Sequence, residues 1–448
     1  MTAPSSSTAQ VERIIPRRNV TAWALWDWAT QPFNTVIITF VFASLYLTSD
    51  AFLDPAIAAL GEGNELYDAA IAELSQHYGW GLTAAGILVA LFAPVLGQRA
   101  DAGGTRKRWI GWMTLVLVAC QLGLFFVEAA PDFFWLGVGC IALGSIVGEI
   151  AGVNYNAMIV QVSTKKTMGR VSGLGWGLGY VGGIVAMVIV VVLTQFDWFG
   201  MDTSNGMAYR MIALGCAVWT VAFAWPLLVY VPEGDSSERP KVGLLAGYVQ
   251  LAKDLGGLWR DARSTLWFLL ASAVYRDGLA GVFTFGAILA ARAFGFSTTE
   301  LMFFGIAANL IAGLATIAAG RLDDRFGPRA VIVASLALII ASGIGVMVFQ
   351  DGGTTVFWIF GLVLSGCVGP AQAASRSLLA RVAPHGKEAE IFGLYATTGR
   401  AVSFLAPLAW SVSLGIFGAI IWGTVGVISV VALGLAMLLL VKTPADKG

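Results

Sequence analysis

The chain has 448 residues, of which 57% are hydrophobic and 12% are charged, and its formal net charge is zero. A soluble chain carries about a quarter of its residues as Asp, Glu, Lys or Arg, so much of this surface must face something other than water. The neutral balance gives no electrostatic reason to expect a nucleic-acid partner. We therefore expect an integral membrane protein whose main partner is the lipid bilayer.

About twelve apolar runs are long enough to cross a bilayer, which takes about 20 residues in a helix. They lie near residues 20–47, 80–100, 108–128, 134–158, 171–194, 210–231, 264–290, 298–320, 329–349, 355–381, 390–415 and 417–441. This pattern predicts an all-α membrane protein with twelve transmembrane helices in two pseudo-symmetric six-helix bundles.

The runs divide the chain into five predicted segments. These are a cytoplasmic tail (1–19), an N-terminal bundle (20–231), a cytoplasmic linker with an amphipathic helix (232–263), a C-terminal bundle (264–441) and a second cytoplasmic tail (442–448). Lys and Arg gather in alternate loops, and the positive-inside rule then puts both termini in the cytoplasm. The acidic loop at 48–79 should lie outside, with a short helix resting on the outer face.

A charged, glycine-bounded turn occurs at matching points of the two halves. Residues 97–109 read GQRADAGGTRKRW and residues 320–329 read GRLDDRFGPR. In this match Asp101 and Arg106 correspond to Asp324 and Arg329. Two copies between apolar runs indicate a duplicated membrane protein, and they resemble the loops between helices 2 and 3 and between helices 8 and 9 of the Major Facilitator Superfamily. We predict that these four residues are gate residues that hold one face closed.

Several ionisable residues lie inside the apolar runs, where each costs about 2.5–3.5 kcal/mol by insertion scales. Such residues usually face a water-filled cavity or one another, so they mark a candidate site. Amide side chains lie about one or two helical turns from three of them and share their faces. The predicted substrate-binding or coupling set is Asp27, Asn34, Glu149, Asn156, Arg276, Asp277, Gln372, Arg376 and Arg400.

Opposite roles follow from opposite charges. We interpret Asp277 and Glu149 as proton or amine sites, and Arg276 and Arg400 as carboxylate or anion sites. Arg276 is adjacent to Asp277 and points about 100° away from it, so a pairing with Glu149 or with an anionic ligand group is expected instead. Structural alternatives remain open: Asp27 as a brace of the inner gate, Asp277 in a structural ion pair, and Arg376 reaching water at a helix end.

The sequence gives no reason to expect an enzyme. It contains no nucleophile elbow, no zinc-protease motif and no phosphate-binding loop. The two histidines fall in loops, and no pair of the four cysteines has metal-ligand spacing. We expect no catalytic residue, no metal and no cofactor, and we expect a proton or ion gradient as the energy source.

Further motifs carry a narrower resemblance. They are WDWA at 26–29 with QPF at 31–33, NAM at 156–158, RVSG at 170–173 with GWGLGY at 175–180, DG at 277–278, QA with SRSL across 372–378, and EAEIFGLY at 388–395. Together they resemble the vacuole-effluxer-like family, which contains fungal vacuolar amino-acid effluxers and bacterial relatives. The sequence departs from the family pattern at Thr30, at Arg276 and at residues 159–161.

The resemblance implies export of neutral amino acids or similar small solutes. With the duplicated bundles and the charges in the spans, we expect a secondary active transporter that works by alternating access, with proton-coupled export of amino acids or related metabolites. We also expect a monomer in a bacterial inner membrane. Two alternatives stay open at this point: lipid or lysolipid handling by the same fold, and a membrane receptor or scaffold that does not transport. The receptor would need large soluble segments, and only residues 48–79 and 231–263 are candidates.

Overall fold

The computed structural model describes residues 15–103, 105–163, 168–195, 206–233, 249, 253, 256–382 and 388–441. Almost all of them are helical, as lipid demands, because a bilayer offers no partners for free backbone groups. The N-terminal half holds α1 (Arg17–Pro32), π-helices η1 (Phe33–Phe40) and η2 (Phe42–Leu47), 3-10 turn η3 (Asp50–Phe52), α2 (Pro55–Ala58), α3 (Glu65–Gly103), α4 (Arg106–Leu124), η4 (Pro131–Phe133), α5 (Phe134–Ala157), α6 (Ile159–Val162), α7 (Met168–Gln195) and α8 (Met207–Tyr230).

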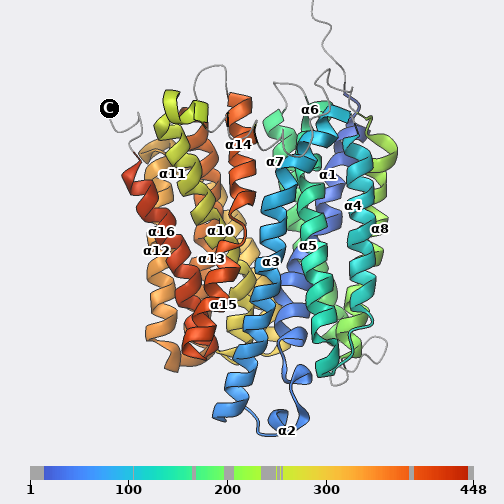
Figure 1. Cartoon of the computed structure of the whole chain (residues 1–448), viewed down its shortest axis with the longest axis vertical. Coiled ribbons are helices and arrows are strands. Elements are labelled where there is room, and N and C mark those ends of the chain that lie inside the picture. The colour runs from blue at the N-terminus through green and yellow to red at the C-terminus, as the bar shows by residue number, and fades with distance from the viewer. Residues whose placement is uncertain are drawn as a thin grey trace, which may run out of the picture.

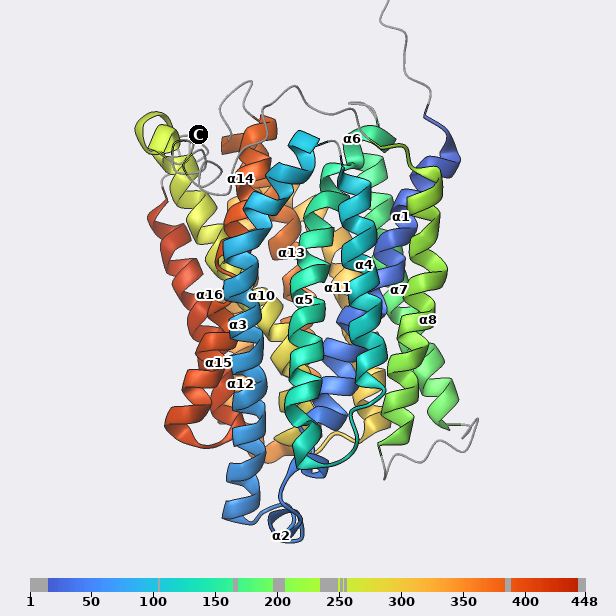
Figure 2. The same ribbon diagram turned by 45° about the vertical axis from the view of Figure 1, so that its right-hand side comes forward.

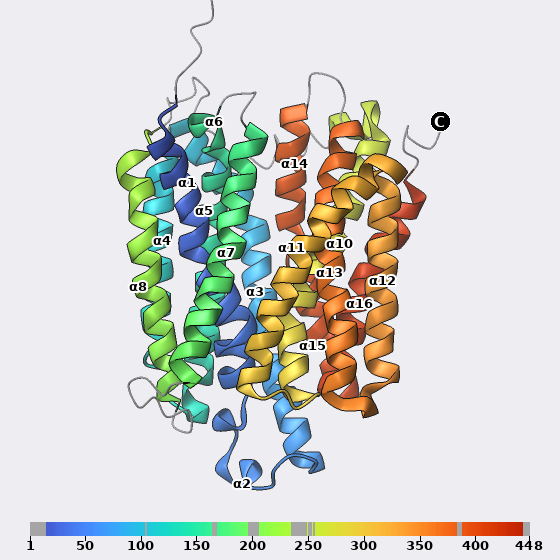
Figure 3. The ribbon, with the colours of Figure 1, turned by 180° about the vertical axis from the view of Figure 1, so that it is seen from behind.

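The C-terminal half has the same construction. It contains α10 (Arg263–Arg292), α11 (Thr298–Phe326), α12 (Pro328–Val348), η5 (Gln350–Gly352), α13 (Gly353–Val382), α14 (Glu388–Ala401), α15 (Leu405–Phe417), η6 (Ile420–Trp422) and α16 (Gly423–Leu440). The two sets form two bundles that stand side by side (Figures 1 and 3). We call these the N-bundle and the C-bundle.

The long helices run between two ends of the molecule. The start of α1 and the end of α16 lie at one end, which we call the terminal end, and α2 lies at the other, which we call the α2 end (Figure 1). The bundles meet where α3 runs beside α14 and α15, as Figure 2 also shows, and where α7 meets α11. The first part of the C-bundle, α10, also packs against η1 and η2.

The predicted fold class is confirmed. Ten helices in the described part of the chain are long and apolar enough to span a membrane. The other two predicted spans correspond to α3 and α4. The helix α4 begins with three cations, at residues 106–108, which lower the hydropathy of its 19 residues.

One prediction about the acidic loop was wrong. Residues 65–79 do not form a separate helix on the outer face; they are the first part of α3, which is continuous over 39 residues. Its length of about 58 Å, at 1.5 Å per residue, exceeds the ~30 Å hydrocarbon core. The helix therefore extends beyond the bilayer at the α2 end.

The predicted tails and linker lie mostly outside the described residues. Within the described part, the first helix starts at Arg17, three residues before the expected start of the N-bundle. In the linker, Leu258 is buried in the core of the C-bundle. The segment proposed as an amphipathic helix falls largely outside the described residues, so that prediction stays a prediction.

The helix α11 shows how the sequence sets both ends of a helix. At the start of α11 the side chains and backbone of Ser297 and Glu300 form a reciprocal capping box. The same helix ends before Gly327, whose φ of +83° suits glycine, and Pro328 then begins α12.

Candidate functional site

Pro32 ends the α-helical part of the first span. Proline lacks an N–H and clashes with the carbonyl four residues earlier, here that of Trp28. That carbonyl accepts a hydrogen bond from the indole Nε1 of Trp219 at 3.1 Å, and the Thr220 hydroxyl donates to the carbonyl of Ala29 at 3.1 Å. Donors on the neighbouring α8 therefore compensate for the break, after which the span continues as η1 and η2.

Asp27 lies on α1, just before this break, and faces α7. A Cβ added at Gly179 of α7 would lie 3.5 Å from the Asp27 carboxyl carbon. The carboxylate interacts electrostatically with Tyr155 of α5 and Tyr180 of α7. Within the described part of the chain, it has no hydrogen bond and no ion pair. Its aromatic surroundings are rigid, because Trp23 stacks on Tyr155 with ring centroids 4.5 Å apart.

The eleventh predicted span is also interrupted, between α14 and α15. Pro407 explains the position, because the carbonyl four residues before it belongs to Ser403, in the non-helical junction 402–404. The Asp277 carboxylate of α10 accepts a hydrogen bond from the backbone N–H of Ala406 at 2.6 Å. The N–H of Leu405 also interacts with this carboxylate.

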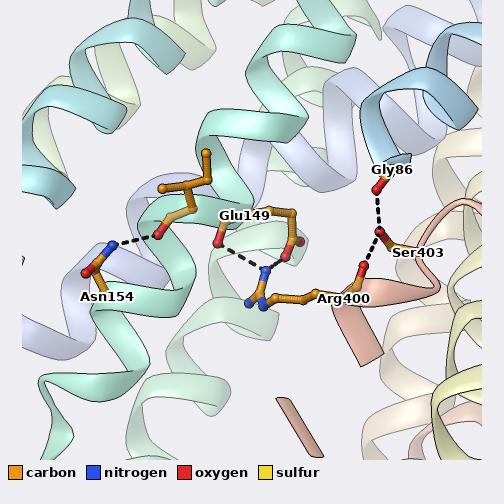
Figure 4. A network of polar contacts seen from close by, with 6 residues as sticks. Gly86, Glu149, Asn154, Arg400 and Ser403 are labelled. Carbon is orange, nitrogen blue, oxygen red and sulfur yellow. Dashed lines mark hydrogen bonds and ion pairs between the residues drawn. The ribbon is translucent and has the colours of Figure 1, made fainter. Parts of the chain in front are cut away.

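The junction carries an ion pair between the bundles (Figure 4). Arg400, in the last turn of α14, pairs with Glu149 of α5, and its Nη1 also donates to the Glu149 carbonyl at 3.1 Å. The Ser403 hydroxyl lies 3.4 Å from the carbonyl of Gly86 in α3. A Cβ at Gly86 would lie only 2.8 Å from the Phe404 Cα, so the bundles touch backbone to backbone here. The expected pairing of Glu149 with Arg276 is wrong, because Arg400 occupies that position.

Arg276 is held by an aromatic residue of α14. Its guanidinium lies 4.0 Å from the ring centroid of Tyr395, and its Nη1 donates to the Tyr395 carbonyl at 3.2 Å. Arg376 of α13 interacts electrostatically with Arg276, Tyr395 and Tyr180. Arg276 and Arg376 of the C-bundle thus lie near each other. Arg376 and Asp27 of the N-bundle both lie near Tyr180.

The three predicted amides are more loosely placed. The side chains of Asn34 on η1 and Asn156 on α5 are exposed, and Gln372 on α13 is partly buried. In the described part of the chain none of these side chains forms a hydrogen bond. They are available to a ligand, and their role stays a prediction.

The described contacts of the predicted gate arginines lie within their own bundles. Arg106 donates to the carbonyl of Ala157 at 2.7 Å, at the end of α5. Arg329 donates to the carbonyl of Leu439 at 3.2 Å, near the end of α16. Each cation thus meets a helix C-terminus, where a positive charge is favourable. The side chains of Asp101 and Asp324 lie outside the described residues, so the gating hypothesis is untested.

The bundles are joined at the α2 end by contacts that the sequence did not reveal. Arg292, in the last turn of α10, donates to the carbonyls of Ser44 and Leu45 at 3.0 and 2.9 Å. The indole of Trp410 donates to the carbonyl of Ser75 at 3.3 Å. Ser44 and Leu45 belong to η2, so two main-chain carbonyls of this π-helix accept hydrogen bonds from Arg292. The described conformation is therefore closed at the α2 end.

A family model described as vacuole effluxer Atg22 like matches residues 160–447, about two thirds of the chain. The chain belongs to the Atg22-like vacuole effluxer family. The matched region contains the whole C-bundle with Arg276, Asp277, Arg376 and Arg400. Asp27 and Glu149 lie before it.

Relatives of this family member include named transporters. An uncharacterized MFS-type transporter of Bacillus subtilis, YxiO, is 25% identical over 401 residues, covering 89% of this chain and 88% of the relative. The gentisate transporter of Corynebacterium glutamicum is 25% identical, covering 78% of this chain and 76% of that protein. Autophagy-related protein 22 of Cryptococcus neoformans is 24% identical, but the match spans only 50% of the fungal protein.

Solved structures place this Atg22-like protein in the Major Facilitator Superfamily fold. The xylose transporter XylE from E. coli, in a partially occluded inward open conformation, superposes with a TM-score of 0.67 over 96% of this chain and 98% of that one, at 13% identity. The human organic anion transporter MFSD10 superposes with a TM-score of 0.64 over 94% and 99%, at 14% identity. At such identities the likeness shows the fold alone.

Sequence reasoning missed several residues of this Atg22-like site. Tyr395, which holds Arg276, stood inside a recognised family motif but was not selected, because a tyrosine in an apolar run is usually a packing residue. Ser403 and Gly86 gave no signal, since their contact exists only where two distant helices meet. Pro407 alone was not a sufficient clue, because Pro226 of α8 and Pro370 of α13 also fall in predicted spans and lie inside continuous helices.

Proposed function

We propose that this protein is a secondary active transporter that exports an amino acid or a related small carboxylate by alternating access, coupled to the proton gradient. We further propose that it resides in a bacterial inner membrane as a monomer, with both termini in the cytoplasm. The family membership and the fold support a transporter. The choice of substrate rests on the charges between the bundles.

The proposal uses charges of opposite sign that the two bundles contribute. The Asp27 carboxylate of the N-bundle has no hydrogen bond and no ion pair in the described part of the chain. Like Arg376 of the C-bundle, it lies near Tyr180. Arg276 contacts the ring and the carbonyl of Tyr395 and has no acidic partner among the described residues. A zwitterionic substrate carries an ammonium group that suits Asp27 and a carboxylate group that suits Arg276. The other predicted acids are engaged, Glu149 with Arg400 and Asp277 with the start of α15.

Alternating access requires the bundle contacts to exchange between two ends. The contacts of Arg292 and Trp410 at the α2 end would have to open, while the terminal end closes. An ion pair such as Arg400–Glu149 near the middle is suited to act as a pivot. A proton on Asp27 in place of the substrate ammonium would discharge the site and allow the empty carrier to return.

An aromatic carboxylate is the second candidate substrate. It is favoured by the relative named a gentisate transporter and by the Tyr395 ring stacked beside the Arg276 guanidinium. Such a ligand would bind Arg276 through its carboxylate and would need no ammonium partner, so Asp27 would then serve the proton alone.

Flux measurements with the purified protein in liposomes test the proposal. We expect amino acids with free carboxylates to raise the melting temperature, as any ligand of the native state does, and a pH gradient to drive their flux. Arg276→Gln should weaken binding by about 10- to 100-fold, because a charged hydrogen bond contributes about 1.5–3 kcal/mol. Arg276→Lys, which keeps the charge, should lose less.

Three outcomes would count against this assignment. Stabilisation by gentisate but by no amino acid would favour the aromatic acid. Stabilisation only by lysolipids would favour lipid handling. Flux that is indifferent to the pH gradient would remove the proton coupling.

A further inference from the structure

The start of α15 near the middle of the eleventh span needs a partner for its backbone. The first N–H groups of a helix have no acceptor within the helix. Here Leu405 and Leu408 donate to carbonyls of the junction, both at 3.0 Å, and Pro407 has no N–H. The N–H of Ala406 remains, and it donates to Asp277 at 2.6 Å. The carboxylate of another helix thus completes the first turn of α15.

Close packing fixes Asp277 in this role. It is only 8% exposed. A Cβ added at Gly281, one turn further along α10, would lie 2.7 Å from the Cβ of Ala406, so α10 and α15 approach as closely as glycine allows. The groups of the described chain that act on the carboxylate are the backbone N–H groups of Leu405 and Ala406. Its neighbour Arg276 is directed to Tyr395 instead.

The opposite side of the same junction touches the N-bundle. Arg400 lies just before the junction and pairs with Glu149. Ser403 lies within the junction, and its hydroxyl is 3.4 Å from the carbonyl of Gly86. Only a few residues separate these contacts from the capped turn. Any shift of the first turn of α15 relative to α10 must therefore move the contacts on which the bundles meet.

We infer that Asp277 is a positioning residue that caps the first turn of α15, holds the junction against α10 and thereby places Arg400 and Ser403 at the N-bundle. The inference rests on the proposed function for its effect on flux, while the cap itself does not depend on it. It also assigns the coupled proton to a group other than Asp277, in contrast to the hypothesis from sequence.

Two substitutions separate a cap from a charge. Asn caps a helix about as well as Asp, so Asp277→Asn should keep the flux and its pH dependence close to wild type. Asp277→Leu has a similar shape and no acceptor. In the full-length protein, it should raise hydrogen–deuterium exchange in peptides covering residues 405–410 by roughly tenfold, since a lost cap costs about 1 kcal/mol or more. It should also reduce flux.

Asp27→Asn on the equivalent first helix of the N-bundle is the matched control. It should leave the exchange at 405–410 unchanged while it reduces flux. Loss of pH-driven flux in Asp277→Asn with normal exchange would overturn the inference, because the charge and not the acceptor would then be required. Unchanged exchange in Asp277→Leu would overturn it as well. If that variant does not fold, the Asn variant decides alone, and if wild type moves no solute, the exchange data still judge the cap.

Discussion

Asp27 and Asp277 lie on corresponding helices of the two bundles, yet their surroundings are opposite. Asp27 faces aromatic rings and, within the described chain, has no hydrogen-bonding partner. Asp277 is bonded to the backbone of α15. On corresponding helices, one aspartate carboxylate thus has no hydrogen bond within the described chain, while the other is a hydrogen-bond acceptor for the backbone of α15. Duplication preserves the helix but not the role of its acid.

The difference follows from where each bundle interrupts a helix. In the N-bundle, Pro32 breaks the acid-bearing helix itself, and Trp219 and Thr220 of α8 satisfy the backbone. In the C-bundle α10 is continuous, and the break lies in the eleventh span, beside it. Asp277 is then the nearest acceptor for the new helix start. Each break is satisfied by groups of another helix, and only the second break uses an acid.

The largest effect should come from removing the carboxylate of Asp27. We expect Asp27→Asn to reduce pH-driven flux by roughly two to three orders of magnitude, because the substrate ammonium would then be buried without a charged partner, which costs about 3–5 kcal/mol. Initial rates in liposomes with and without a pH gradient measure this. Asp27→Glu should retain a larger part of the flux. Equal flux in Asp27→Asn and wild type would end the contrast between the two acids.

A smaller effect should follow from wedging the junction away from α3. In Gly86→Val the new side chain would meet the backbone of Phe404, where even a Cβ lies at 2.8 Å. We expect a loss of about 1–3 kcal/mol of stability, as overpacking gives, seen as a lower melting temperature. Gly139, which has open space around it, is a control, since Gly139→Val should change little. Equal melting temperatures for both variants would deny that the bundles touch backbone to backbone here.

The smallest effect should come from the break in the first span. Trp219→Phe keeps an aromatic ring near Trp28 but removes the donor to its carbonyl. An unsatisfied buried carbonyl costs about 1–2 kcal/mol, which thermal unfolding in detergent would detect. Phe223 packs against Trp219 and Trp28 without this hydrogen bond, so Phe223→Leu shows what ring packing alone contributes. A Trp219 variant no weaker than that control would show that α8 does not stabilise the break.

Much of the architecture was predictable from the sequence, because each span is long and apolar. The predicted spans and the two bundles were recovered from hydropathy and from the repeated turn. Length, however, says nothing about continuity. The extension of α3 into the acidic loop and the break between α14 and α15 depend on contacts with other helices. Pro32 and Pro407 lie at the two breaks, but Pro226 and Pro370 lie inside continuous helices, so proline alone does not locate a break.

The candidate site was predictable as a set of residues but not as a set of pairs. Hydropathy identifies Arg276, Arg400 and Glu149 because any charge in an apolar run is costly. It does not say which of two arginines meets the glutamate, since that depends on the rotation and depth of helices from different bundles. The pairing with Arg400 and the cap by Asp277 are tertiary facts of that kind.

The contact of Arg292 with the carbonyls of Ser44 and Leu45 has a consequence for genetics. Both acceptors belong to the main chain, so they are present whichever amino acids occupy positions 44 and 45. A mutational scan would therefore register this closure from one side only, as intolerance at Arg292. At positions 44 and 45, which are buried, such a scan would report side-chain packing and not these hydrogen bonds.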